Sequence, residues 1–315
     1  MNPDVSVIIA NYNRLNLIPR AIDSCRNQSC SIEIIVVDDH SNDGSWEWLQ
    51  SQPDIISVRN EINSGQPFSI NRGMALATGR YFKFLDSDDF LNKNTLHLQV
   101  IAGDEHQADI VISRCDEFHS KTQTIVERPE AGPWEDFTAR QLGADYGSHM
   151  SAMIFKKELA IQVPRRADAA FMEDRMAILE MCLRNPKIAY LPGCTGYWVF
   201  HEQQMTNFNK QGMSTVVSHY QYRLIFKRIL TVMEERNMLT PLRKKAACER
   251  LWILAEWIAK HHLHEALEIE NWIYSLCPDF KPQYAGITGT LYKNMGFKKT
   301  QQLLTLRRNL LKLFN

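Results

Sequence analysis

Two acidic turns, each following a short run of strand-forming residues, constrain the fold more than any other feature of this sequence. Glu33–Val37 leads into the turn 38–45, and Tyr81–Leu85 leads into Asp86-Ser87-Asp88-Asp89. A third run, Val5–Ile9, lies near the start, and stretches of helical spacing separate the runs. Strands that alternate with helices build a mostly parallel sheet. The carboxyl ends of parallel strands share one edge, so both turns are predicted to lie where open α/β sheets bind ligands.

The pattern changes after residue 105. Strand candidates at Asp109–Ser113, Ser151–Phe155 and Lys187–Leu191 are separated by longer irregular stretches, which favours a mixed sheet. From about residue 214 onward helical patterns dominate, including a stripe formed by Val216, Val217, Tyr220, Leu224, Ile229, Leu230 and Met233. The polar stretch 205–212 predicts a boundary. We therefore expect an α/β domain over residues 1–208 and an all-helical domain over residues 209–315.

Composition excludes several classes of protein. Lys and Arg number 36 and balance 36 Asp and Glu, which argues against a nucleic-acid binder that relies on bulk charge. The seven cysteines form no CxxC pair and are odd in number, so neither a disulfide framework nor a zinc ribbon is expected. The sequence shows no secretory signal and no apolar stretch of roughly 18 to 20 residues. A cytoplasmic location is the simplest expectation.

The stretch 298–314 combines leucines with five basic residues and no acidic one. Such a helix can lie peripherally on an anionic membrane surface, at the inner face of the cytoplasmic membrane. It can equally dock on its own domain or on a second subunit. The sequence leaves these alternatives open.

The turn Asp86-Ser87-Asp88-Asp89 holds three carboxylates within four residues. Carboxylates at this spacing repel one another unless a positive group neutralises them. Divalent Mg²⁺ or Mn²⁺ suits such oxygen ligands. The alternative is a solvated acidic turn, but its position at a strand end favours a functional site.

Six motifs in the first ninety residues carry a resemblance to a known family. They are Val5–Arg14, Ile35–Ser45, Asn63-Ser64-Gly65, Asn71-Arg72-Gly73, Ala77–Tyr81 and Leu85–Asp89. In this order and at these separations they resemble the N-terminal half of the inverting family 2 glycosyltransferases, which have the GT-A fold. The resemblance implies a Rossmann-like, nucleotide-sugar-binding α/β domain and a place in bacterial polysaccharide biosynthesis.

The resemblance also implies roles for individual residues. Ala10 and Tyr12 would line the pocket for a uridine, and Asp39 would accept a hydrogen bond from the base, while one of Asp38 and Asp39 is expected only to cap its turn. Asp86 would lie against the ribose or a metal-bound water, with Ser87 in the same nucleotide site. Asp88 would bind the metal directly, and His201 is a second ligand candidate or a buried structural histidine. The implied cofactor is Mn²⁺ or Mg²⁺.

Glu173-Asp174 precedes an amphipathic helix and resembles the family's acidic pair. The implied base is Asp174, which would take the acceptor's hydroxyl proton, and Glu173 would hold the acceptor. Many relatives carry an Arg before the Asn of the fourth motif, and this chain has Ile70, so a diphosphate contact from that position is absent. Arg72, Arg80 and Lys83 are candidate substitutes, although each is equally typical of an ordinary surface charge.

These observations predict an inverting glycosyltransferase. Its donor would be a nucleotide diphosphate sugar, UDP-linked by expectation, and its acceptor a saccharide or lipid-linked saccharide. Two alternatives stay open. A nucleotidyltransferase is disfavoured because Asn11-Tyr12-Asn13-Arg14 stands where its Gly- and basic-rich loop belongs. A non-catalytic nucleotide-sugar or glycan-binding protein would be favoured if Asp174 pointed away from the donor pocket.

Overall fold

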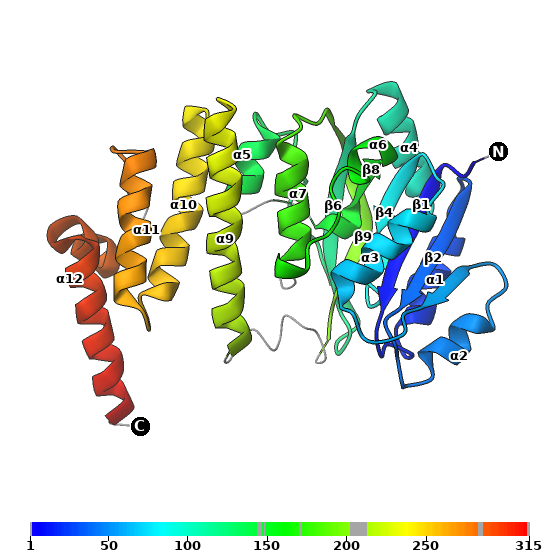
Figure 1. The fold of residues 1–315 in the computed structure, drawn as a ribbon, viewed down its shortest axis with the longest axis horizontal. Coiled ribbons are helices and arrows are strands. Elements are labelled where there is room, and N and C mark those ends of the chain that lie inside the picture. The colour runs from blue at the N-terminus through cyan, green and yellow to red at the C-terminus, as the bar shows by residue number, and fades with distance from the viewer. Residues whose placement is uncertain are drawn as a thin grey trace. The chain divides into compact units, whose positions relative to one another are not determined.

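The computed structural model describes residues 2–143, 147, 149–169, 172–201, 213–282 and 286–313. The chain divides into two compact units, residues 1–135 with 147–207 and residues 136–146 with 208–315. Within the described ranges, the first unit holds all strands and the second is helical (Figure 1). The segment 136–146, which the sequence analysis placed in the first domain, groups with the helical unit because α5 (Phe137–Leu142) packs against α10 (Pro241–Ile258).

The described strands of the first unit form one mixed sheet in the order β3-β2-β1-β4-β8-β6-β9-β5, with β7 paired to β6. The first four strands are parallel, as are β6 and β9, whereas β8 runs antiparallel to both of its neighbours. This arrangement confirms the mixed sheet expected from the sequence. The strands are β1 (Val5–Asn11), β2 (Ile32–Asp38), β3 (Ile56–Arg59), β4 (Tyr81–Phe84), β5 (Phe90–Leu91), β6 (Ile110–His119), β7 (Thr124–Val126), β8 (Met153–Lys156) and β9 (Ile188–Phe200).

Helices connect these strands. Most of them form where the residues after a strand recur at the spacing of a helix. α3 carries Pro67 in its first turn, where a missing backbone N–H is tolerated. Two short 3₁₀ turns, 150–152 and 167–169, flank α6. The α-helices among the described residues of this unit are α1 (Ile18–Arg26), α2 (Ser45–Gln50), α3 (Gln66–Leu76), α4 (Leu96–Glu105), α6 (Lys157–Ala160) and α7 (Glu173–Cys182).

Different helices cover the two faces of the parallel strands, because successive side chains in a strand point to opposite faces. Val7 pairs in register with Ile34, and both side chains are buried in the core that α1 and α4 complete. Ile8 faces the other side, toward Gly73 of α3. A Cβ on Gly73 would lie 2.5 Å from Cγ2 of Ile8, so only glycine allows α3 to lie this close to the sheet.

The carboxyl ends of β1, β2 and β4 meet at one edge of the sheet. The backbone N–H of Asp39 donates to the carbonyl of Asn11 at 2.7 Å, and the N–H of Leu85 donates to the carbonyl of Ile8 at 3.1 Å. Both acidic turns therefore begin at the same edge, as the alternation of strands and helices predicted.

The helical unit contains α5, α9 (Met213–Glu235), α10, α11 (Leu263–Leu276) and α12 (Gly286–Leu313), the last kinked at Gly296. Its core includes Ile229, Leu230 and Met233, as the stripe predicted. Leu224 is a correction, because it is exposed while the next residue, Ile225, is buried. Val216 and Val217 lie outside the residues whose side chains are described. None of the helices in the described ranges has the length and hydropathy that a membrane span requires.

Candidate active site

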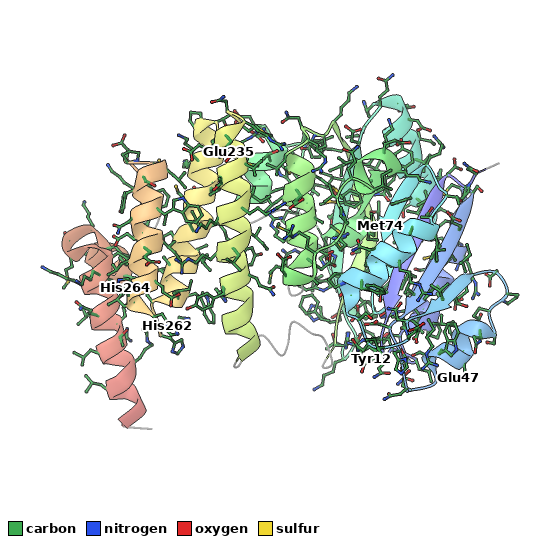
Figure 2. The ribbon with its side chains drawn as sticks, in the orientation of Figure 1. Tyr12, Glu47, Met74, Glu235, His262 and His264 are labelled. Carbon is green, nitrogen blue, oxygen red and sulfur yellow. The ribbon has the colours of Figure 1, made fainter. Side chains whose placement is uncertain are left out.

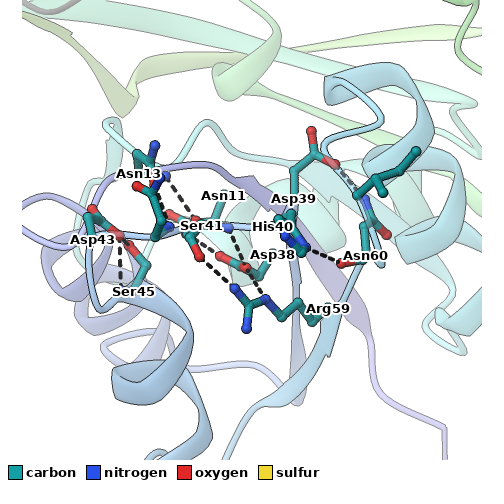
Figure 3. Close-up of polar contacts among 12 residues, drawn as sticks. Asn11, Asn13, Asp38, Asp39, His40, Ser41, Asp43, Ser45, Arg59 and Asn60 are labelled. Carbon is teal, nitrogen blue, oxygen red and sulfur yellow. Dashed lines mark hydrogen bonds and ion pairs between the residues drawn. The ribbon is translucent and has the colours of Figure 1, made fainter.

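A network of hydrogen bonds, here called the turn network, surrounds the turn after β2 (Figure 3). Its centre is Asp38, whose side chain is fully buried. The carboxylate accepts hydrogen bonds from Asn11 Nδ2 at 3.0 Å and from the backbone N–H of Ser41 at 2.9 Å, and Nε of Arg59 lies 3.5 Å away. Asn11 ends β1 and Arg59 ends β3, so this carboxylate ties three strand ends together and caps its own turn.

Asp39 holds the loop that leads into α3. Its Oδ1 accepts from Asn60 Nδ2 at 2.7 Å and from the backbone N–H of Ser64 at 2.8 Å, and its Oδ2 accepts from the N–H of Gly65 at 2.8 Å. Gly65 has a φ of 85°, which favours glycine. A carboxylate offers about four acceptor positions, so about one remains for the N–H of a base.

Ala10 and Tyr12 flank Asn11 at the end of β1. Ala10 is half-buried and points to the same face of the sheet as Ile8. Tyr12 is 44% exposed and lies at the carboxyl edge of the sheet (Figure 2). An exposed ring beside buried hydrogen-bonding groups is a surface on which a flat base can stack.

Asp88 and His201 approach each other from the ends of β4 and β9. The distance between Asp88 Oδ2 and His201 Nε2 is 3.0 Å, and Nε of Arg14 lies 3.9 Å from the same carboxylate oxygen. Adjacent ligands of an octahedral cation with bonds of about 2.1 Å are about 3 Å apart. The two residues proposed from the sequence as metal ligands are thus brought together at a suitable separation.

The same turn contributes to a second group of potential ligands, formed by Asp86, Asp89 and His149, whose ligand atoms all lie within 4.8 Å of one another. Asp89 accepts the backbone N–H of Val199 at 2.9 Å through Oδ1, while its buried Oδ2 is reached by no described donor with good hydrogen-bond geometry. His149 stacks on Trp198 with ring centroids 5.3 Å apart. Sequence reasoning missed His149, because no motif marks it.

Glu173 and Asp174 begin α7, as their sequence pattern predicts. Their carboxylates share Nη1 of Arg165, at 2.9 Å from Glu173 Oε2 and 3.0 Å from Asp174 Oδ1. The Glu173 side chain is 5% exposed and the Asp174 side chain 39% exposed. Of the two carboxylates, Asp174 is therefore the one that a dissolved substrate can reach.

A pocket joins these carboxylates to the end of β4. Its lining combines acidic side chains with apolar ones from α3 and β4, and the cation among the lining residues is Arg165. The lining residues are Gln66, Ile70, Phe84, Leu85, Asp86, Met150, Ser151, Arg165, Glu173 and Asp174. Ser87, the other nucleotide-site candidate, follows Asp86 in the sequence. Its side chain is buried and does not line the pocket.

The carboxylate site, defined as Asp86, Asp88, Asp89, Glu173 and Asp174, has more negative charge than its cations neutralise. Burial, together with the charges of Asp174 and Asp88, raises the pKa of Asp86 to about 8. Burial likewise raises the pKa of Glu173 well above its usual range, against the opposing effect of Arg165. Burial and the charges of Asp86 and Asp88 raise the pKa of Asp89. Such a site favours an added proton or cation.

The candidate substitutes for a diphosphate-binding arginine at position 70 lie elsewhere. Arg72 donates to the carbonyl of Arg59 at 2.6 Å and to Asn60 Oδ1 at 2.8 Å, on the side of the turn network. Arg80 is exposed and forms ion pairs with two surface aspartates. Lys83 is fully buried. None of the three lines the pocket, whereas Ile70 does.

The region of this chain that resembles known proteins includes both acidic turns. Residues 6–164, half of the chain, match the family model described as Glycosyl transferase family 2. A relative from Escherichia coli, the UDP-Glc:alpha-D-GlcNAc-diphosphoundecaprenol beta-1,3-glucosyltransferase WfaP, is 39% identical over 89 residues, which are 27% of this chain and 36% of that protein. The matched regions span about a third of the length of the first curated relatives.

Two solved structures share the fold over most of the chain. S. aureus TarS 1-349 in complex with UDP-GlcNAc is 19% identical, with a TM-score of 0.58 over 92% of this chain and 95% of that one. The mannosyltransferase PcManGT from Pyrobaculum calidifontis, in complex with GDP-Man and Mn²⁺, is 18% identical, with a TM-score of 0.52 over 97% and 88%. These likenesses confirm the expected GT-A fold. The matched range 6–164 contains the turn network and the Asp86–Asp89 turn, and on this evidence the chain belongs to glycosyl transferase family 2.

Proposed function

We propose that this protein transfers a sugar from a UDP-linked donor to a hydroxyl of a saccharide acceptor, with inversion, in the assembly of a bacterial surface polysaccharide. The observation that carries the proposal is the half-exposed carboxylate of Asp174, which lines one pocket with Asp86 and is held by Arg165 at the start of α7. The printed names of the relatives support the substrate class, since WfaP uses UDP-Glc and a diphosphoundecaprenol-linked acceptor and TarS holds UDP-GlcNAc.

The donor's nucleotide would lie against the turn network. Tyr12 offers an exposed ring for the base, Ala10 lies beside it on β1, and Asp39 keeps about one acceptor position for a base N–H. The sugar and diphosphate would then extend toward Asp86 and Ser87, at the end of the neighbouring strand. The bond to be broken, between the sugar and the diphosphate, would then lie next to the pocket that Asp174 lines.

The reaction requires one base and one displacement. Asp174 would remove the proton of the acceptor hydroxyl as that oxygen attacks the sugar carbon from the face opposite the leaving diphosphate. Asp174 lies in the first turn of α7, where an acidic side chain stabilises the helix. Glu173 lines the same pocket, and its nearly enclosed carboxylate helps Asp174 to hold Arg165. A non-catalytic binding protein would not need Asp174 to face the pocket.

The residues present fit a divalent cation. Asp88 and His201 are suitably spaced, and Asp89 follows Asp88 in the same turn. We assign Asp88 and His201 as the residues that would hold Mn²⁺ or Mg²⁺, with Asp86, Asp89 and His149 as the neighbouring donor group. Bound there, the cation would neutralise charge that develops on the leaving diphosphate. Mn²⁺ accompanies GDP-Man in the PcManGT structure.

Calorimetric titration tests the donor site. UDP is titrated into the wild type and into Asp88→Ala, His201→Ala and His149→Ala, with and without Mn²⁺, and Asp23→Ala on the exposed surface of α1 serves as the control. We expect Mn²⁺-dependent UDP binding that weakens at least about tenfold in Asp88→Ala and His201→Ala. A larger loss in His149→Ala than in His201→Ala would move the cation to the neighbouring group. No nucleotide binding under any condition would refute the donor site.

We further propose that α12 contacts the inner membrane surface peripherally. Leu303, Leu306 and Leu310 are 41%, 57% and 48% exposed, and their spacing places them on one helix face, with Lys299 and Arg307 beside them. Phe297 and Gln301 are buried on another face. An apolar stripe with basic flanks matches an anionic lipid surface.

Vesicle sedimentation tests this contact. The wild type should sediment with vesicles containing phosphatidylglycerol and stay in solution with phosphatidylcholine alone. The triple change Leu303→Ser, Leu306→Ser and Leu310→Ser should abolish sedimentation, whereas Leu224→Ser, at another exposed leucine, should not. Sedimentation that survives the triple change, or self-association that it removes, would contradict the proposal.

A further inference from the structure

Asn71 clamps the backbone of a residue 94 positions away. Its Oδ1 accepts the backbone N–H of Arg165 at 2.7 Å, and its Nδ2 donates to the backbone carbonyl of Arg165 at 2.8 Å. One side-chain amide therefore satisfies both polar groups of a loop residue, as a neighbouring strand would. Asn71 projects from α3, which Gly73 fixes against the sheet.

The clamped residue is the cation of the pocket. The Arg165 side chain is 1% exposed, and its guanidinium carbon lies 4.4 Å from the centre of the Phe84 ring. Its Nη1 donates to both Glu173 and Asp174, and its Nη2 donates toward Met150 Sδ at 2.7 Å. These contacts restrict the planar guanidinium, and a shift of the Arg165 backbone would displace it from them.

We propose that Asn71 is a positioning residue for the catalytic base: by fixing the Arg165 backbone it sets the guanidinium, and through it the carboxylate of Asp174. This inference rests on the proposed function, since it concerns the base of that reaction. Neither amide atom of Asn71 is needed to bind a nucleotide, because both are directed at the backbone of Arg165. Loss of the clamp should therefore slow turnover without weakening UDP binding.

The adjacent residues of α3 provide a matched contrast. Arg72 reaches Arg59 and Asn60 on the side of the turn network. Arg72→Gln should weaken UDP binding, whereas Asn71→Ala should lower kcat. Ala75→Ser, at an exposed position of the same helix, is the neutral control.

The experiment combines three measurements on the purified full chain. UDP affinity is measured by calorimetry with Mn²⁺, turnover is measured as release of UDP from UDP-GlcNAc, and backbone hydrogen exchange is measured by mass spectrometry. For Asn71→Ala we expect a UDP Kd within twofold of the wild type, a kcat at least tenfold lower, and faster exchange confined to segments within 161–182. Asn71→Asp, which can accept from the Arg165 N–H but cannot donate to its carbonyl, should fall between Asn71→Ala and the wild type in exchange rate. The melting temperature of each variant shows whether it is folded.

Each result decides between distinct conclusions. If hydrogen exchange at 161–182 is unchanged in Asn71→Ala, Asn71 does not hold this segment, whatever the activity of the variant. Faster exchange with an unchanged kcat would make Asn71 merely structural and would overturn the positioning role. A wild type that binds UDP but releases none from UDP-GlcNAc or UDP-Glc would count against the proposed transfer reaction, and the exchange data would still decide on the clamp. A wild type that binds no nucleotide would refute the proposed function itself, while the exchange data would still report on the clamp.

Discussion

The turn network and the carboxylate site lie at the same edge of the sheet, but the pKa values of their carboxyl groups shift in opposite directions. In the turn network each aspartate has several donors, and hydrogen bonds from Ser45 and Leu15 outweigh burial and lower the pKa of Asp43. In the carboxylate site burial and crowding raise the pKa of Asp86 to about 8. The aspartates of the turn network therefore have the hydrogen-bond donors that they need. The carboxylate site lacks positive charge, which a bound cation can supply.

The largest expected effect follows from changing Asp174, the proposed base. Asp174→Asn keeps the size of the side chain but cannot take a proton, so turnover should fall by about 1,000-fold. UDP affinity should stay within about threefold, because the turn network is unchanged. Release of UDP from a UDP-sugar measures the first and calorimetry the second. Glu180→Gln, farther along α7, is the control, and an Asp174→Asn variant with wild-type turnover would exclude this residue as the base.

A smaller effect is expected where the scaffold is broken. Asp38→Asn removes a buried charge that faces Arg59 and presents an amide to donors that need an acceptor. We expect a loss of about 3 kcal/mol in the free energy of unfolding, measured by urea titration. Asp23→Asn, on the exposed surface of α1, should change stability by less than about 0.5 kcal/mol. A loss below about 1 kcal/mol for Asp38→Asn would contradict the scaffold assignment.

The smallest effect concerns Lys83, the lysine buried in β4. Burial lowers the pKa of Lys83 to about 7, and its Nζ lies 3.4 Å from Gln99 Oε1. Unfolded lysine titrates near pH 10.4, so above pH 7 the unfolded chain binds more protons at this position than the folded one, and stability rises with pH. Between pH 6.5 and 8.5 the contribution of Lys83 should rise by about 2 kcal/mol, seen as the difference between the wild type and Lys83→Met, because Asp86 with its raised pKa contributes in the opposite direction in both proteins.

Urea titrations of the wild type and Lys83→Met across this range isolate the contribution of the lysine. The rise should be missing in Lys83→Met and present in Lys93→Met, which alters an exposed lysine. Parallel pH profiles for the wild type and Lys83→Met would show that Lys83 keeps its charge when folded.

Local features of the sequence predicted one side of this comparison well. The β-branched runs predicted β1 and β2, and the aromatic run predicted β4. The acidic residues after β2 and β4 lie at the shared edge. The pair Glu173-Asp174 predicted the start of α7 because acidic side chains favour a helix amino end. Each of these inferences depended on residues that are neighbours in the chain.

The other side depended on long-range pairing. β8 pairs antiparallel with β4, with Phe155 opposite Phe82, and this register carries His149 and Arg165 to the end of β4. No periodicity reports which strands will pair, so neither residue could be identified from the sequence. The same limit explains Leu224, since helical spacing alone did not determine which side of α9 packs inward.

The close approach of Gly73 to Ile8 has a consequence for engineering donor choice. Asn71 and Arg72 are consecutive in α3, and they contact the backbone of Arg165 and the turn network respectively. Gly73 holds this part of α3 close to the sheet. A graft that exchanges the loops before α3 for those of a relative should therefore stop at Gly65. An exchange that continued beyond Gly65 would replace α3, including Asn71 and Gly73. We expect such a graft to lose turnover even where it changes donor specificity.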